Sequence, residues 1–411
     1  MPVRSHSLAW AAIAISAFAA PATAQPATET ETETDAELAA ALASDLATAT
    51  ATTAPAAPQS GLAAAAGSIM NPDLALILDI AGAWFSAADH LQTGGHDPTR
   101  TGFTLQQVEL AAGKAVDPYF RFDANLVFTP EGVEVEEAYA TTLALPANLQ
   151  VRAGELFTRF GRINSIHPHA WAFVDQPFAI GRAFGPDGYH GPGVEVSYLT
   201  PLPWFVEVIA SATDAHGEET ARSFLGDSEQ PIDTPRDVLG TAAVKQFFEL
   251  GPDWSLLTGV SLASGPNATG PGKRSNIVGG DLYLKWRPIS HARDRMLVVQ
   301  TEWLHRRRQV PGRVLVDTSG YAYVVGHVAR RWAVGGRWEY GTAADDAGGD
   351  DLDPEWIEAR QRLSSNLTFY PTEFSRLRLQ GSVDRPGWRD PIWAGFLALE
   401  VSAGAHGAHT F

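Results

Sequence analysis

Five arginines late in the sequence repeat at the spacing that places side chains on one face of a β-strand. Arg337 stands alone in its segment, while Arg360 and Arg362, and likewise Arg376 and Arg378, lie two residues apart. On three successive strands these arginines would form a basic stripe, which would guide anions through a water-filled interior. A second set of charged residues on earlier segments could face the same interior: Glu109, Arg121, Asp123, Glu134 and Glu136.

Basic and acidic walls that face each other would create a transverse electric field across such an interior. The alternative is that the long polar side chains only pair with one another along the wall. The sequence leaves both interpretations open.

The longest polar connection, Thr158 to His190, is rich in charged and aromatic residues. Its charged candidates are Arg159, Arg162, Asp175, Arg182 and Asp187. The alternative interpretation is a loop that packs over the mouth of a barrel without setting selectivity. We favour a constriction, because a wide barrel with an unplugged lumen must be narrowed by something.

Two pairs of histidines are the candidates for metal binding. His167 and His169 lie in the long connection, and His406 and His409 lie near the end of the chain. Residues three apart on a strand point to opposite faces, so the second pair could chelate only on a helix or turn. Pro168 places the first pair in a loop. We interpret all four as polar surface histidines, with weak zinc binding as the alternative, and expect no cofactor.

Catalysis has little support in the sequence. No G-x-S-x-G, H-E-x-x-H or Gly-rich phosphate loop is present, and Ser165 beside His167 is a chance-level match. We therefore do not expect an enzyme. Arg306, Arg307 and Arg308 begin a predicted external loop and could hold lipopolysaccharide phosphates, with a solvated loop base as the alternative.

The segments that carry these residues alternate polar and apolar side chains from position 71 onwards. In the segment Phe374 to Asp384, for example, Arg376 and Arg378 oppose Leu377 and Leu379. A period of two predicts β-strands, and the apolar face is as bulky as a lipid-facing one. The same alternation is clear in Tyr119 to Phe128 and in Trp332 to Tyr340.

Short and long connections alternate between these segments, as they do in outer-membrane barrels. The short joints are Asp117-Pro118, Leu145 to Asn148, Thr200 to Pro203, Leu250 to Asp253, Pro288 to Asp294, Ala329 to Arg331 and Tyr370 to Glu373. The long ones are Ala88 to Thr101, Thr158 to His190, Thr213 to Arg236, Ser264 to Ser275, Arg307 to Ser319 and Thr342 to Glu355, with Thr129 to Gly132 short where a long one is due. Counting between them predicts about sixteen strands.

Aromatic residues lie beside the short joints, at the level of an interfacial girdle. They are Phe120, Trp204, Phe205, Trp254, Trp286, Tyr370 and Phe374. A soluble β-sandwich would have no reason to place them there, so we predict a transmembrane barrel over residues 71–411.

The two ends of the chain indicate export and membrane assembly. Residues 1–24 have the pattern of a signal peptide, with Arg4, an apolar run and a small-residue cleavage site before Gln25. Residues 25–70 form a low-complexity leader, expected in the periplasm, which could contain one short helix. Phe411 resembles the terminal signal that the barrel-assembly machinery reads. The chain has no cysteine, and its net charge of −17 argues against nucleic acid as a partner.

The sequence also resembles a family of Gram-negative outer-membrane porin-like proteins, some labelled zinc-regulated outer-membrane receptors. The resemblance covers about residues 70 to 411 and rests on the stretches NPDLALILDIAGAWFS, GGHDPTRTGFTLQQVELA, VDPYFRFDANLVF, GVEVEEAYATTLALPANLQVRAGELFTRFGRIN, HPHAWAFVDQPF, YPTEFSRLRLQ and FLALEVSAGAHGAHTF. More distantly, the chain is similar to phosphate-selective porins, which are trimeric sixteen-stranded channels. A receptor would need a plug and a barrel of about 22 strands, more than this length supplies.

Together these features predict an all-β protein: an antiparallel up-and-down transmembrane barrel of about sixteen strands with a long third loop. We expect a channel for passive diffusion of small hydrophilic solutes, with anions preferred. The alternatives are a zinc-linked uptake or binding protein and a structural barrel with a blocked lumen. Expected partners are outer-membrane lipids and lipopolysaccharide, the barrel-assembly machinery and small anionic or neutral solutes, with a homotrimer left open.

Overall fold

The structure is a closed antiparallel β-barrel of sixteen strands, as the sequence predicts. The computed structural model describes residues 72–130, 132–344 and 356–404. The predictions on residues 1–24 and 25–70, on Phe411 and on His406 and His409 lie outside these residues. The strands are β1 (Asp73–Phe85), β2 (Gly102–Ala115), β3 (Phe120–Phe128), β4 (Val133–Thr142), β5 (Leu149–Phe157), β6 (His190–Leu199), β7 (Phe205–Thr213), β8 (Leu239–Glu249), β9 (Trp254–Pro266), β10 (Arg274–Trp286), β11 (Met296–Val310), β12 (Arg313–Ala329), β13 (Trp332–Gly341), β14 (Arg360–Thr372), β15 (Ser375–Pro386) and β16 (Ile392–Gly404).

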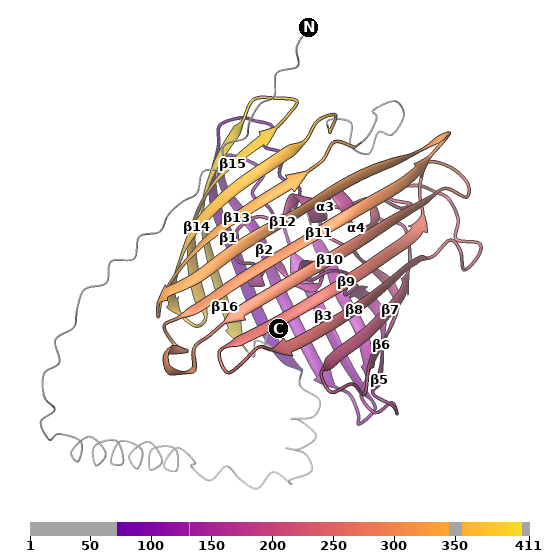
Figure 1. Ribbon diagram of the computed structural model, residues 1–411, viewed down its shortest axis with the longest axis horizontal. Coiled ribbons are helices and arrows are strands. Elements are labelled where there is room, and N and C mark those ends of the chain that lie inside the picture. The colour runs from indigo at the N-terminus through magenta and orange to yellow at the C-terminus, as the bar shows by residue number, and fades with distance from the viewer. Residues whose placement is uncertain (1–71, 131, 345–355, 405–411) are drawn as a thin grey trace, which may run out of the picture. The chain divides into compact units, whose positions relative to one another are not determined.

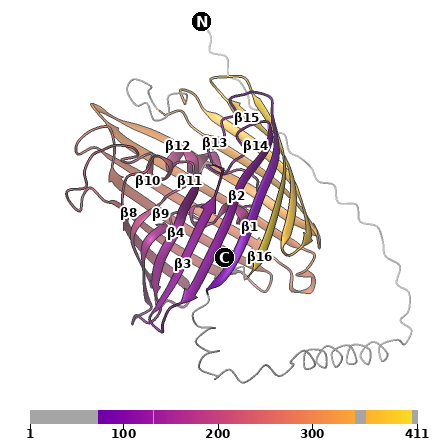
Figure 2. The same cartoon turned by 180° about the vertical axis from the view of Figure 1, so that it is seen from behind.

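Each strand pairs with its neighbours in sequence, and β1 pairs with β16 to close the ring. The closing ladder runs from the Ala75–Gly404 pair to the Phe85–Ala394 pair. Figures 1 and 2 show the tilted strands of this ring from opposite sides. Closure leaves no unpaired sheet edge, which is the condition for a β-structure to sit in lipid.

Side chains alternate between the outside of the barrel and its lumen. In β1, Leu74, Leu76 and Leu78 are exposed on the outside, whereas Ala75 and Ile77 are buried on the inside. The outer face therefore presents aliphatic side chains along the strands, as a lipid-facing belt requires.

Most of the predicted aromatic girdle lies on this outer face. Phe120, Trp204, Phe205, Trp254 and Phe374 are exposed, and the rings of Trp254 and Trp286 lie 6.2 Å apart.

The prediction for Tyr370 was wrong. In β14 the even-numbered residues from Arg360 to Thr368 are buried on the lumen side, and Tyr370 continues their row. Its ring stacks on that of His327, with the two centroids 5.5 Å apart. Proximity to a turn does not by itself decide the face of a side chain.

The connections follow the predicted alternation of short turns and long loops, with one correction. Residues 307–319 were expected to form a long loop, but β11 runs to Val310 and β12 begins at Arg313. The turn between them contains Gly312, whose φ of 82° suits glycine. The two strands continue because their inward side chains find polar partners in the lumen, Arg306 with Asp317 at 2.7 Å among them.

Two long loops fold into the barrel. We call residues 158–189 loop L3 and residues 214–238 loop L4. The short helices are η1 (Ile163–Ser165), η2 (Pro168–Ala170), α3 (Phe178–Ala183), α4 (Glu218–Ala221) and η3 (Ile289–His291). Among the described residues, no helix has the length and apolar character needed to span a membrane.

A Leu379→Arg variant tests the assignment of the outer face. Leu379 is 59% exposed near the middle of β15, between Leu367 and Leu397. A charge against lipid at mid-depth costs about 2–4 kcal/mol, so the folded, heat-modifiable fraction should fall. The matched control is Leu250→Arg in the exposed β8–β9 turn, which should fold normally. Equal folding of both variants would contradict the lipid-facing belt.

Candidate constriction site

Loop L3 crosses the inside of the barrel and forms an apolar core there. Phe160, Ile180, Phe184 and Tyr189 are almost completely buried, together with Phe224 of L4. They pack against inward residues of the wall, namely Leu239, Ala263, Ile277, Leu304 and Tyr321. Burying one such side chain contributes roughly 1.5–3 kcal/mol, so the loop is held as firmly as a protein core. Figure 1 shows α3 within the ring of strands.

Basic and polar side chains of β13, β14 and β15 bind one carboxylate of this loop. Asp175 accepts a hydrogen bond from Arg337 at 2.7 Å, from Arg362 at 2.8 Å and from Gln380 at 2.6 Å. Burial alone would raise the pKa of Asp175, but the two guanidinium groups hold it below its usual range. The carboxylate is therefore charged and fully paired.

The remaining arginines of the stripe hold backbone carbonyls of the loops. Arg378 donates to the carbonyls of Trp171 at 2.9 Å and of Phe173 at 2.7 Å. Arg376 donates to the carbonyls of Trp171 and His169 and pairs with Glu400. Arg360 reaches the carbonyl of Leu91 at 2.6 Å and pairs with Asp384.

These contacts correct the expectation that the stripe lines open water. All five arginines point into the lumen, but Arg337, Arg360, Arg362 and Arg378 are buried beneath loop L3. The reason is that a loop inside a barrel has no sheet partners for its carbonyls, and the guanidinium groups supply the missing donors.

A second, acidic wall formed by β2 and β4 holds the histidines of the same loop. His169 bonds Glu109 at 2.7 Å. His167 lies 3.0 Å from Glu136 and 2.9 Å from Glu137. From the loop between β1 and β2, His96 bonds Glu136 at 3.0 Å. Of the predicted histidines, His167 is therefore a half-buried latch and His169 a buried one, and neither is a surface residue.

The charge states of the loop residues follow from these contacts. Burial opposes the charge of His167, but Glu109, Glu136 and Glu137 raise its pKa well above the usual value. Burial likewise opposes the charge of His96, and its bond to Glu136 raises the pKa to about 9. Burial raises the pKa of Asp97 and of Asp187 to about 7. Near neutral pH the two histidines are therefore cationic latches on carboxylates.

The described residues contain no group of three or more His, Asp or Glu side chains that could hold a metal ion. Both ring nitrogens of His167 face glutamates, so this histidine is not placed to act as a base for Ser165. The described part of the chain therefore contains no set of metal ligands that would support zinc binding.

The other predicted charged residues range from buried to exposed. Arg182 is buried 3.6 Å from Asp317, and Asp187 near the end of L3 has His96 and His190 in its neighbourhood. Arg159 pairs with Glu195 and Glu207, both at 2.7 Å, and keeps a quarter of its side chain exposed. Arg121 and Asp123 form a half-exposed ion pair at 2.7 Å, and Glu134 is exposed.

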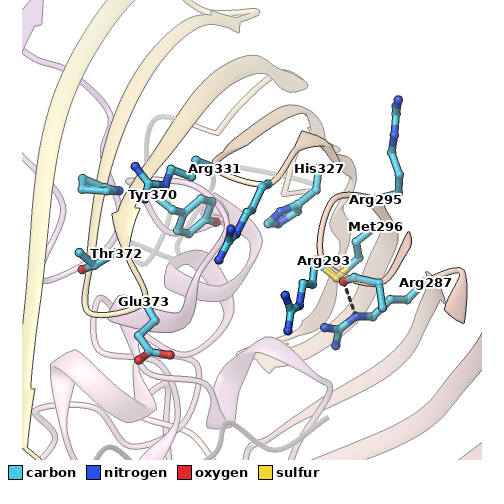
Figure 3. A pocket seen from close by; sticks show the side chains of 12 residues that line it. Arg287, Arg293, Arg295, Met296, His327, Arg331, Tyr370, Thr372 and Glu373 are labelled. Carbon is cyan, nitrogen blue, oxygen red and sulfur yellow. Dashed lines mark hydrogen bonds between the residues drawn. The ribbon is translucent and has the colours of Figure 1, made fainter. Parts of the chain in front are cut away.

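Arg162 differs from the other arginines of the site. Its guanidinium lies 3.8 Å above the Tyr283 ring and donates to Gln300 at 3.1 Å. No ion pair is recorded for it within residues 72–130, 132–344 and 356–404. Beyond Tyr283, Lys285 continues the inward row of β10, and Arg287 (Figure 3) follows directly after the end of that strand toward the short turns. A basic path thus leads from loop L3 to that mouth.

Sequence reasoning missed the third anchor of the loop. The backbone of Gly161 bonds Ser261 at 2.9 Å and Lys245, and Glu302 accepts from the backbone of Ile163 at 3.2 Å. Gly161 has a φ of 58°, and a Cβ there would overlap the Glu302 carboxylate. The available signal was a glutamate, Glu302, on the inward row of β11.

Loop L4 was also missed as part of the site. The backbone of Arg222 donates to the carbonyl of Phe184 at 2.9 Å, and Ser223 bonds Ala183. Arg306 of the wall donates to Ser223 at 3.0 Å and to the carbonyl of Arg182 at 3.2 Å. Arg306 is therefore part of the internal packing, which corrects its assignment to an external lipopolysaccharide site; Arg307 alone of the three is exposed.

Solved structures of outer-membrane porins and channels share this barrel fold. The outer membrane channel DcaP of Acinetobacter baumannii matches with a TM-score of 0.55 at 13% identity, over 81% of this chain and 97% of that one. An anion-selective porin from Comamonas acidovorans gives 0.52 at 11% identity, over 81% and 99%. The trimer form of OmpT of Vibrio cholerae gives 0.51 at 10% identity, over 81% and 99%.

The chain belongs to one family with an uncharacterized protein of Aquifex aeolicus. The two sequences are 31% identical over 384 residues, which cover 83% of this chain and 80% of the relative. No family model matches the chain.

An Asp175→Asn variant tests whether the buried carboxylate holds loop L3. Removing one partner of a buried ion pair costs about 3–5 kcal/mol, because Arg337 and Arg362 would lose their counter-charge. We expect faster cleavage within residues 158–189 by added protease, mapped by mass spectrometry. The control is Asp123→Asn in the half-exposed pair, which should leave the loop protected. Unchanged protection in Asp175→Asn would show that the apolar core alone holds the loop.

The latches predict that loop L3 loosens as pH rises. Against the effect of burial, glutamate partners raise the pKa of His167 in L3 well above its unfolded value of about 6.5, and that of His96 in the neighbouring β1–β2 loop to about 9. The stabilising effect of both histidines is complete below about pH 6.5 and disappears as pH passes the raised pKa values. Asp97 and Asp187, with raised pKa values of about 7, act in the same direction because their ionisation above that pH opposes burial. A protease active from pH 6 to 10 should cut L3 faster at the alkaline end, relative to an unfolded peptide. A flat ratio would contradict the latch.

Proposed function

We propose that this protein is an outer-membrane channel for passive diffusion of small hydrophilic solutes and that it prefers anions. The observation that carries the proposal is Arg162, a half-buried cation at the edge of the internal loop with Tyr283 and Gln300 as its recorded contacts. Lys285 on β10 and Arg287 just beyond its end continue this basic row. Fixed charge of one sign in a confined aqueous passage raises the local concentration of the opposite ions.

Water-accessible charged residues inside the ring support a channel over a blocked barrel. The side chain of Arg121 is 44% exposed and that of Asp123 24%, and both point inward from β3. The side chains of Arg159 and Glu207 are 25% and 19% exposed, which is similar to Asp123. These residues occupy the side of the lumen away from the basic wall, and this is where we propose that solutes pass.

The basis for anion preference differs from the one that the sequence suggested. Each arginine of the stripe from Arg337 to Arg378 pairs with a carboxylate of Asp175, Glu339, Asp384 or Glu400. A wall whose charges are paired in this way exerts little net field on a passing ion. We therefore assign selectivity to Arg162 and the row below it, and assign the stripe to holding the loop.

The remaining parts of the proposal concern assembly. We keep residues 1–24 as a signal peptide, residues 25–70 as a periplasmic leader and Phe411 as the signal for the assembly machinery. A homotrimer is also part of the proposal, in line with the trimer form described for OmpT of Vibrio cholerae. Light scattering of the detergent-folded chain measures this state directly.

Planar-bilayer recording in a salt gradient tests the function. A stepwise conductance, with a zero-current potential whose sign shows that anions are the more permeant ions, supports the proposal. Conductance with a preference for cations would contradict the proposed anion selectivity but not the proposed channel function. No conductance in a folded sample would favour a structural barrel with a blocked lumen or a zinc-linked binding protein.

An Arg162→Gln variant tests the residue assignment. A unit charge about 4 Å from an ion in water contributes ~1 kcal/mol, so the anion-to-cation permeability ratio should fall about fivefold. Arg100→Gln, an exposed arginine in the β1–β2 loop, removes the same charge outside the lumen and should leave the ratio unchanged. Equal shifts in both variants would assign the preference to overall charge and not to Arg162.

A further inference from the structure

An internal cavity of ≈ 20 Å³ lies where loop L3 meets the loop between β1 and β2. We call residues 86–101 loop L1 and this space the L1–L3 cavity. L1 contributes His96 to its lining, the wall contributes Glu136 of β4 and Phe157 of β5, and L3 contributes the other residues. The volume exceeds the ~10–15 Å³ that one water molecule requires, so the cavity has room for a ligand of that size.

Loop L1 is bonded to L3 on both sides of helix α3. Before the helix, the carboxylate of Asp97 accepts a hydrogen bond from the backbone of Gln176 at 2.8 Å. After the helix, the backbone of Gly95 donates to the carbonyl of Pro186 at 3.0 Å. A ligand in the cavity therefore lies between two loops that hold each other.

Two acceptors that line the cavity lack a donor. Gln176 is 3% exposed, and its side-chain nitrogen donates to the carbonyl of Pro186 at 3.1 Å. That bond fixes which end of the amide is the nitrogen, and the oxygen Oε1 then has no partner among the described residues. For the half-buried carboxylate of Asp187, too, no hydrogen bond is recorded within the described part of the chain. Buried acceptors are normally paired, either with protein donors or with ordered water.

The donors around the cavity are already engaged. Both ring nitrogens of His167 face glutamates, and His96 bonds Glu136. The side-chain nitrogens of Asn164 and Trp171 donate to backbone carbonyls of L3. A ligand that satisfies the two free acceptors must therefore supply the hydrogens itself.

We propose that the L1–L3 cavity binds one water molecule, which donates to Oε1 of Gln176 and to the carboxylate of Asp187. The two hydrogens of water match the two acceptors. Two histidines and two carboxylates line the cavity, so its charge does not favour an ion such as ammonium over a neutral donor. Because Gln176 precedes α3 and Asp187 follows it, the water ties the two ends of this helix together.

This site goes beyond the proposed function and does not depend on it. Water held between L1 and L3 exchanges with the solvent only when the two loops separate. Its exchange therefore reports a local opening of the loops, which is a smaller motion than unfolding of the barrel.

The first test is a crystal structure of the full chain folded in detergent, in ammonium-free buffer and at a resolution that shows ordered water. We expect a density peak within hydrogen-bonding distance of Gln176 Oε1 and of the Asp187 carboxylate. Gln176→Met removes the acceptor at a similar side-chain volume and should abolish the peak. The matched control is Gln106→Met on β2, which removes bonds to the carbonyls of His96 and Val174 but no lining group, so its peak should remain.

Radiolytic labelling under anaerobic conditions tests the same site in solution. After rapid mixing with water enriched in heavy oxygen, buried Phe157 and Ile163 should take up heavy oxygen with a lag, because the enclosed water exchanges slowly. Leu250 in the exposed β8–β9 turn should take it up at once. The lag should disappear in Gln176→Met and persist in Gln106→Met.

Four outcomes would overturn the site. The first two are absence of the peak in the parent chain and an unchanged peak in Gln176→Met. Loss of the peak in both variants would assign it to loop closure in general and not to Gln176. A peak that forms only in ammonium buffer would assign the cavity to an ion and not to water. If Gln176→Met does not fold, Asp187→Leu removes the other acceptor and should abolish the peak in its place.

Discussion

The interior of this barrel depends on how a charged loop is accommodated where bulk water is excluded. Asp175 lies fully buried, and an isolated carboxylate there would be prohibitively unfavourable. Arg337 and Arg362, on adjacent strands, and Gln380 on the next each reach one of its oxygens. The pairing is geometrically specific, because three side chains at fixed register positions converge on one carboxylate. Loop L3 therefore has one position along the wall, and the shape of the passage follows from it.

The basic stripe also supplies hydrogen-bond donors to the backbone carbonyls of the loop. Loop carbonyls inside a barrel cannot join a sheet, and each buried carbonyl without a donor destabilises the fold. Here the carbonyls of Trp171, Phe173 and Asp175 are taken by Arg378 and Arg337, and that of Ala172 by Asn366. Arginine suits this role since one guanidinium carries five donors in a rigid fork. The period-two spacing of the stripe thus matches the rise of an extended segment lying across three strands.

The sequence was informative about the wall and much less so about the loop. Alternation specifies which side chains of β15 face inward, because a shift of one residue would turn Leu379 to the lumen and Arg378 to lipid. The same rule cannot say where the residues from Thr158 to Tyr189 go, since a loop has no such period. It also fails at strand ends, where Tyr370 was assigned outward and Arg306 to a loop. Partners such as Asp175 for Arg362, 187 positions apart, are visible only in three dimensions.

The two walls of opposite charge have a consequence for selectivity. Acidic residues of β2 and β4 bind histidines of the loop, while the basic residues of β13 to β15 bind its carboxylate and carbonyls. The acidic wall is offset by the histidines that it binds, and the basic wall by Asp175 of the loop and by Glu339, Asp384 and Glu400 of the strands. The transverse field across the barrel is therefore largely cancelled. What a solute meets is the remainder: Arg162 beside the loop and the basic row that follows it. Their effect is local, which is how a chain with a net charge of −17 can still present a basic path to anions.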